Sequence, residues 1–199
     1  MIDLLDQFPA DAPLHVLDLG CGVGRNSIPI AKKMPRATVV CVDLLESAID
    51  QLKNYCKRFH VERQMELIQS DISDYGIEEN AFDYVIAVSS LEHVASKLSM
   101  IDVLQALMLG TKAGGFNCFI INSNVEEVML TTGEKIEPCM EVNLSTEALL
   151  VILRHVYGGW EELAVQPKAL EYEVTREGEK VLLRTTALTY VVRKRWTSC

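Results

Sequence analysis

Residues 16–27 read Val16-Leu17-Asp18-Leu19-Gly20-Cys21-Gly22-Val23-Gly24-Arg25-Asn26-Ser27, and this stretch decides the fold. An apolar run ends in three glycines at alternate positions, and a helical pattern follows. One glycine would suffice for a tight turn, whereas three let a ligand approach the backbone closely. We therefore expect a ligand site here, formed by Gly20, Cys21, Gly22, Gly24, Arg25 and Asn26.

The glycine spacing differs from the dinucleotide fingerprint G-x-G-x-x-G. Counted from Gly20 the third glycine would fall at Arg25, and counted from Gly22 it would fall at Ser27. Asp18 precedes the glycines, and its carboxylate would repel a pyrophosphate but attract an amino group, directly or through water. The methionine half of S-adenosylmethionine (SAM) carries such a group. The loop favours SAM, and a nicotinamide-dependent oxidoreductase is the weaker alternative.

Outward from this loop, short apolar runs alternate with helical stretches. We expect strands at 14–19, 37–43, 65–70, 82–88 and 116–122, and helices at 26–33, 47–59, 98–112 and 145–157. Pro29 places the first helix start near Asn26, with Asn26 or Ser27 as the cap. Gly114-Gly115 is expected to stop the third helix and Ser145 to cap the fourth. The alternation predicts a doubly wound α/β fold with a mostly parallel sheet.

The last third of the chain changes character. Two extended runs, 160–175 and 181–193, flank a turn at 176–180, which predicts a C-terminal antiparallel hairpin. The stretch 123–140 follows the fifth strand and is expected either as a plain surface loop or as a lid on the acceptor side of the site.

Acidic residues follow the second and third strands, at the sheet edge where ligands bind. Asp43 comes 19 residues after Gly24 and can accept hydrogen bonds from both ribose hydroxyls, with Leu44 beside it. Asp71 can accept from an adenine amino group, with Ile72 against the ring. A helix N-cap at Asp43 and an Asx-turn at Asp71 are the structural alternatives.

The fourth strand ends in Val88-Ser89-Ser90-Leu91-Glu92-His93, where the methionine part of SAM and an acceptor should meet. Ser89 is a candidate cofactor contact. His93 is a candidate general base, although a lone histidine after a strand more often only hydrogen-bonds to its loop. Glu92 and Tyr172 are weaker candidate bases.

These features together resemble the class I SAM-dependent methyltransferase superfamily, and residues 16–27, 114–117 and 186–194 look closest to its tellurite-resistance group. The resemblance implies one domain over residues 1–199, a seven-stranded sheet of order 3-2-1-4-5-7-6, and S-adenosylhomocysteine (SAH) as product. Two features depart from the group. Only 13 residues precede Leu14, and Tyr172-Glu173 stands where the group has a His-Arg pair, with Arg176 and Lys180 in the turn.

Composition limits the partners. The chain has 199 residues, 49% of them hydrophobic, and a net charge of −9, which disfavours nucleic-acid binding. It has no apolar run long enough for a membrane span, and its first residues predict no signal peptide. Six scattered cysteines show neither CxxC pairs nor metal-ligand spacing, which predicts free thiols, no metal and a cytoplasmic protein.

The sequence therefore predicts methyl transfer from SAM to a small molecule. The acceptor is expected to be a chalcogen oxyanion such as tellurite, or a thiol. An oxyanion or a thiolate is already anionic and would need no base. The short N-terminal stretch motivates an alternative, a non-catalytic SAM-binding or partner module. A homodimer partner is a further way to cover the site.

Overall fold

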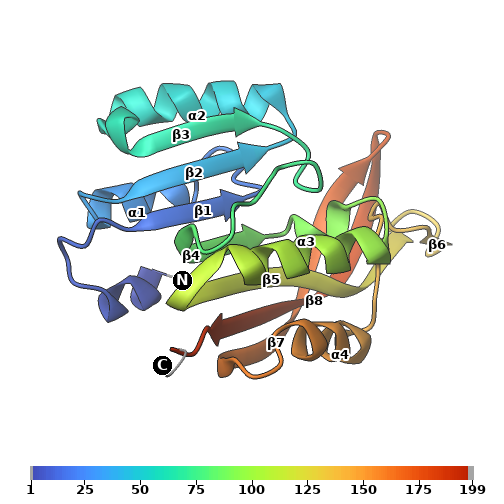
Figure 1. The fold of residues 1–199 in the computed structure, drawn as a ribbon. Coiled ribbons are helices and arrows are strands. Elements are labelled where there is room, and N and C mark those ends of the chain that lie inside the picture. Colours follow the sequence, from blue (N-terminus) through green and yellow to red (C-terminus); the bar gives the residue numbers. More distant parts are fainter. Residues whose placement is uncertain (1, 197–199) are drawn as a thin grey trace.

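The computed structural model describes residues 2–196, which form a twisted sheet with helices on both faces (Figure 1). The strands are β1 (His15–Leu19), β2 (Thr38–Asp43), β3 (Met65–Gln69), β4 (Phe82–Val88), β5 (Thr111–Met129), β6 (Lys135–Ile136), β7 (Glu161–Arg176) and β8 (Glu179–Arg193). The α-helices are α1 (Ser27–Lys33), α2 (Glu46–Phe59), α3 (Lys97–Gly110) and α4 (Thr146–Val156). Three 3-10 turns span Ile2–Gln7, Glu62–Gln64 and Leu91–His93. None of the helices in residues 2–196 is both long and apolar enough to cross a membrane.

The strand order is β3-β2-β1-β4-β5-β8-β7, with the short β6 paired to β5. β7 and β8 are the expected sixth and seventh strands, so the predicted order is confirmed, and β6 is an additional eighth strand. β1 runs parallel to β2 and β4, whereas β8 runs antiparallel to β5 and β7. The order reverses between β1 and β4, which is where ligands bind in open α/β sheets.

Alternate residues of the central strands supply two separate cores. Val16 faces the side covered by α1 and α2, while Leu17 and Leu19 face the side covered by α3 and α4. All three side chains are fully buried. A parallel strand covered on both faces is mostly apolar, which explains why β1 is apolar apart from His15 and Asp18.

The first helix starts where Pro29 requires, within its first turn, but not with the expected cap. Asn26 stands at the N-cap position without a side-chain cap bond. The Ser27 hydroxyl donates to a carboxylate oxygen of Asp18 instead. Ser145 does cap α4, since its hydroxyl accepts from the Ala148 amide at 3.2 Å.

The expected helix 98–112 ends early, and the expectation that Gly114-Gly115 stop it is wrong. α3 ends at Gly110, and β5 already begins at Thr111, so both glycines lie inside the strand. Gly114 has a φ of +79° at a register shift of the β4–β5 pair. A side chain there would lie 2.3 Å from the Trp196 ring, so the close approach of the chain end requires glycine.

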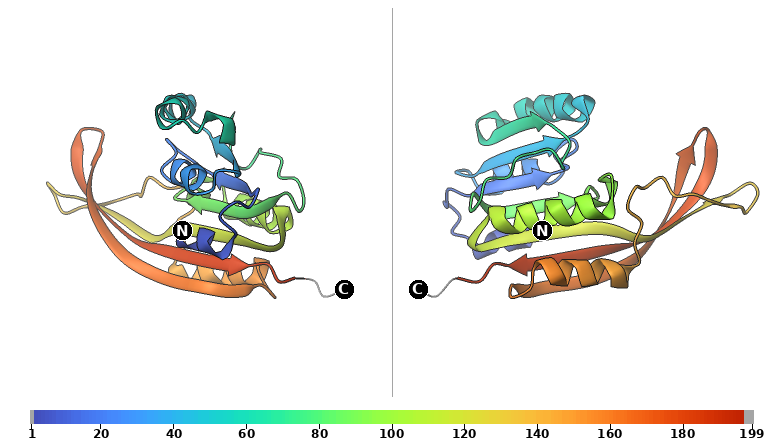
Figure 2. Two further views of the ribbon diagram at one scale, coloured as in Figure 1. Left: turned by 90° about the vertical axis from the view of Figure 1, so that its left-hand side faces the viewer. Right: turned by 45° about the vertical axis from the view of Figure 1, so that its right-hand side comes forward.

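The terminal hairpin extends well beyond the parallel strands and curls away from them (Figure 2). Its turn is Glu177-Gly178, whose φ angles of +50° and +89° suit a tight two-residue hairpin. β5 continues to Met129 along β8, so the first part of stretch 123–140 is strand rather than loop. The chain then turns through β6 and returns toward the sheet before α4.

Candidate functional site

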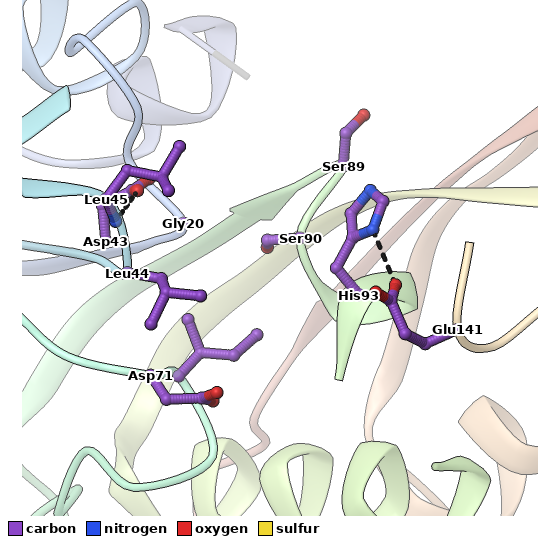
Figure 3. Close-up of a pocket in the computed structure, with 10 residues that line it drawn as sticks. Gly20, Asp43, Leu44, Leu45, Asp71, Ser89, Ser90, His93 and Glu141 are labelled. Carbon is purple, nitrogen blue, oxygen red and sulfur yellow. Dashed lines mark hydrogen bonds and ion pairs between the residues drawn. The ribbon is translucent and has the colours of Figure 1, made fainter. Parts of the chain in front are cut away.

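A pocket of about 370 Å³ opens at the carboxyl ends of β1 to β4 (Figure 3). Its lining residues come from the loops that follow these strands and from the chain that returns after β6: Gly20, Asp43, Leu44, Leu45, Asp71, Ile72, Ser89, Ser90, His93 and Glu141. The topology alone brings these loops together, because parallel strands end at one edge of the sheet.

Asp43 is fixed at the junction of the second strand and the glycine loop. One carboxylate oxygen accepts from the Gly22 amide at 2.7 Å, and the other accepts from the Leu45 amide at 3.0 Å. Leu45, not Asp43, occupies the N-cap position of α2, and no side-chain cap bond forms there. Each carboxylate oxygen keeps a lone pair, so Asp43 can accept further hydrogen bonds from a ligand.

The three glycines of the loop serve different purposes. A Cβ at Gly20 would lie 2.2 Å from the Ser90 Cβ, and a Cβ at Gly24 would lie 2.4 Å from Leu52. These two glycines are required by close packing of the loop. Gly22 has a φ of +51°, and a Cβ there would meet no atom within 4 Å. Of the three, only this glycine opens toward free space.

Asp18 lies fully buried beneath the loop. Ser27 satisfies one carboxylate oxygen, whereas Oδ1 has no hydrogen-bond partner. Burial raises the pKa of Asp18 to about 6, against the opposing effect of the Ser27 hydrogen bond. A buried carboxylate oxygen without a hydrogen-bond partner lowers the stability of the folded protein. Such an oxygen indicates a position that can accept a hydrogen bond from a donor group of a ligand.

Asp71 and Ile72 follow β3 and both line the pocket. The Ser73 amide donates to Asp71 Oδ1 at 2.8 Å, so the predicted Asx-turn is present. This turn does not exclude the binding role, because it engages only one of the two carboxylate oxygens and Asp71 still lines the pocket (Figure 3).

Ser89 follows β4 in a left-handed conformation, with a φ of +51°. The Asn122 side-chain amide donates to Ser89 Oγ at 3.2 Å and to Glu92 Oε1 at 2.7 Å. Glu92 is fully buried, its Oε2 has no partner, and burial raises the pKa of its carboxyl. Glu92 does not line the pocket, so it acts as a support between β4 and β5 rather than as the weaker candidate base.

His93 meets the carboxylate of Glu141 at one side of the pocket. Its Nδ1 lies 3.0 Å from Glu141 Oε2, and the other ring nitrogen points away from that carboxylate (Figure 3). The His93 hydrogen bond lowers the pKa of Glu141. The Val142 amide donates to the Glu92 carbonyl at 3.0 Å and ties the returning chain to the end of β4.

The structure brings seven of the predicted site residues into one pocket and leaves six outside its lining. The six are Asp18, Cys21, Gly22, Gly24, Arg25 and Asn26, and two of them, Gly24 and Arg25, line a different groove. Sequence reasoning missed Leu45, Ser90 and Glu141. Leu45 and Ser90 adjoin predicted residues, and Glu141 lies one residue beyond the stretch considered as a lid.

Other candidates from the sequence lie elsewhere. Tyr172 is half exposed on β7, and Arg176 in the hairpin forms a two-point ion pair with the buried Glu127 at 2.9 and 3.2 Å. Within residues 2–196, no group of three or more His, Cys, Asp and Glu side chains is arranged to hold a metal.

Comparison with known proteins agrees with this geometry. A family model described as a methyltransferase domain matches residues 16–115. A bifunctional methyltransferase of Rickettsia conorii is 24% identical over 154 residues, which cover 74% of this chain but 29% of the relative. This chain thus spans less than a third of that protein.

Two solved structures share the fold. TehB from Haemophilus influenzae superposes with a TM-score of 0.72 at 20% identity, covering 98% of this chain and 61% of TehB. A SAM-dependent methyltransferase from Methanosarcina mazei gives a TM-score of 0.67 at 17% identity, covering 98% of each chain. Since the family model spans 100 of the 199 residues, from β1 through the glycine loop into β5, the chain belongs to the methyltransferase-domain family of class I SAM-dependent methyltransferases.

Proposed function

We propose that this chain transfers a methyl group from SAM to a small-molecule acceptor, as one domain over residues 1–199. The observation that carries the proposal is the pocket at the switch in strand order, which combines carboxylates at Asp43 and Asp71 with a polar couple, His93 and Glu141. This arrangement offers acceptors for a nucleoside at one side and a proton acceptor at the other.

The residues present fit the cofactor. Asp43 would accept from the ribose hydroxyls, and Asp71 from the adenine amino group with Ile72 against the ring. The unpartnered Oδ1 of Asp18 would serve the amino group, directly or through water. Gly22 leaves space for close approach of a ligand to the backbone.

Bound SAM supplies a methyl group that its sulfonium already activates. The chain has to align the acceptor, exclude water and, where the acceptor carries a proton, remove it. His93 can do this. When its Nδ1 carries the proton and donates to Glu141, the other ring nitrogen keeps a lone pair. Glu141 then acts as a positioning residue.

The charges around the pocket support a thiol acceptor over an oxyanion such as tellurite. Among the described residues, the lining includes Asp43, Asp71 and Glu141 but neither lysine nor arginine. Arg176, the hairpin arginine, is held by Glu127. An oxyanion such as tellurite would meet a carboxylate and no fixed cation, whereas a thiol would arrive neutral and lose its proton to His93. We therefore propose a thiol acceptor.

Calorimetry with SAM and SAH tests the cofactor site. We expect the wild type to bind both ligands, and Asp43→Ala to weaken binding by about 1.5–3 kcal/mol, or about 10- to 150-fold, the range for hydrogen bonds to a charged group. Asp50→Ala, an exposed carboxylate on α2, is the matched control and should bind as the wild type does. Unchanged affinity in Asp43→Ala removes Asp43 from the ribose site, and no heat from the folded wild type contradicts the SAM site itself.

Methylation of a panel of small thiols tests the acceptor side. We expect His93→Gln to lower kcat about 100-fold or more, within the range for loss of a general base, and to leave the KM for SAM unchanged. Glu141→Gln should give a smaller loss, because the ring keeps its nitrogen but loses its orientation. Tyr172→Phe is the control. Full activity in His93→Gln would mean that the acceptor reacts as a ready-made anion, and the oxyanion would then be preferred.

A further inference from the structure

A second and larger groove of about 570 Å³ lies between α1 and α2. It shares no lining residue with the pocket described above. One wall is the outer side of the glycine loop at Gly24 and Arg25, and the other wall is the last turn of α2. The groove has a size that ordinarily accommodates a small ligand, since such sites measure about 300–1,000 Å³.

The floor of this groove is apolar and partly aromatic. Ile28 on α1 is buried, while Tyr55 and Phe59 on α2 lie with their ring centroids 6.3 Å apart. Phe59 keeps 37% of its surface exposed. A large aromatic ring left open to solvent in a concave site is the kind of surface that an apolar ligand covers.

Three cations surround this floor. Lys32 Nζ lies 3.8 Å from the centroid of the Phe59 ring, and Arg58 Cζ lies 5.7 Å from it. Arg25 lines the groove from the glycine loop. Within residues 2–196, none of the three forms an ion pair with a carboxylate. No carboxylate of the described residues therefore neutralises these charges, and the contact of Lys32 with the Phe59 ring places its ammonium group at the aromatic floor.

The local charge here is opposite to the charge of the whole chain. Residues 25–63 contain eight of the 19 Lys and Arg and four of the 28 Asp and Glu, a net charge of +4. The remaining residues carry −13, which together give the chain's −9. Of these cations, Arg25, Lys32 and Arg58 line the groove, and its lining among the described residues includes no Asp or Glu, whereas the methyltransferase pocket is lined by carboxylates.

We propose that the groove between α1 and α2 binds an amphiphilic anion, with an aromatic or acyl body and a carboxylate, sulfonate or phosphate head. The body would lie on Ile28, Tyr55 and Phe59. Arg25, Lys32 and Arg58 would meet the head, since charge-assisted hydrogen bonds are about twice as strong as neutral ones. The two halves of the ligand match the two kinds of side chain.

Titration with 8-anilinonaphthalene-1-sulfonate (ANS), followed by its fluorescence, tests this site. We expect saturable one-to-one binding that SAH does not displace. N-Phenyl-1-naphthylamine, the same body without the sulfonate, should bind at least about tenfold more weakly because the cations add nothing to it. Displacement of ANS by SAH, or equal binding of the two dyes, overturns the proposal.

Charge reversal locates the dye. Lys32→Glu with Arg58→Glu should weaken ANS binding at least about tenfold, as expected for loss of two charge-assisted contacts. The matched control, Lys97→Glu with Lys168→Glu, makes the same change in net charge at exposed positions outside the groove and should bind within about twofold of the wild type.

Circular dichroism must show that both double variants are folded. If Lys32→Glu with Arg58→Glu does not fold, Arg58→Gln is measured in its place, with at least about threefold weaker binding expected. Unchanged dye affinity in the folded groove variant overturns the site while leaving the methyltransferase proposal untouched, because SAH binding is measured separately.

Discussion

A single buried carboxylate, Asp18, links stability to the proposed cofactor site. Its burial raises its pKa from 3.8 to about 6, although Ser27 donates to it. The protonated form is therefore favoured by folding. The contribution of protonated Asp18 to the free energy of unfolding is fully present below the unfolded pKa of 3.8 and is lost as pH rises through the folded pKa of about 6.

We expect the free energy of unfolding to fall by about 2 kcal/mol from this group between pH 4 and pH 7, since one pKa unit corresponds to about 1.4 kcal/mol and part of the loss already lies below pH 4. Asp18→Asn should remove that fall, and urea denaturation across this pH range measures it. Burial also raises the pKa of Glu92, so Glu92→Gln is the companion variant that separates the two contributions. If the free energy of unfolding of Asp18→Asn falls with pH as steeply as that of the wild type, Asp18 is not the group responsible.

The same Asp18→Asn variant should bind SAM more weakly if Asp18 serves the amino group. A carboxylate that costs stability at neutral pH and strengthens ligand binding is typical of a functional position. The sequence predicts this role for Asp18 because the residue lies directly before the glycine loop, and burial of its carboxylate is what the structure adds.

Elements that depend on local pattern were predicted well, and those that depend on distant contacts were not. The strand before Gly20 and the helix start near Pro29 follow from neighbouring residues alone. Gly114-Gly115 gave the same local signal as a helix stop. What places it inside β5 is the end of the chain, since the Gly114 amide donates to the Lys194 carbonyl at 2.9 Å and Gly114 packs against Trp196.

The site shows the same division between local and distant information. The places of Asp43, Asp71 and Ser89 at the pocket could be predicted because each lies at or just after the end of a stretch that reads as a strand. The place of Glu141 could not be predicted, because it is separated from His93 by 48 residues in the sequence and does not follow a strand of the parallel sheet. Its place depends on the hydrogen bond from the Val142 amide to the Glu92 carbonyl, which ties the returning chain to the segment that follows β4.

The two edges of the sheet differ in length, and a long edge strand can pair with a second copy of the molecule. One edge is β3, with five residues, and the other is β7, with 16 residues. A long unpaired edge invites pairing with another chain. β7 is blunted by Pro167, which cannot donate a hydrogen bond, and by the exposed Lys168, while Glu171 and Glu173 add charge farther along. These residues argue against a dimer formed through this edge.

Hydrogen exchange measured by mass spectrometry tests that expectation over the whole chain. Amides of β1 and β4, buried on both faces, should exchange most slowly. The middle of β7 should exchange faster than the facing part of β8, because β8 is paired on both sides and β7 on one. Rates in β7 should not change with protein concentration, and concentration-independent exchange in α4 is the internal control. Protection of β7 that rises with concentration would show that a second copy covers the edge, and Pro167→Ala should then increase it.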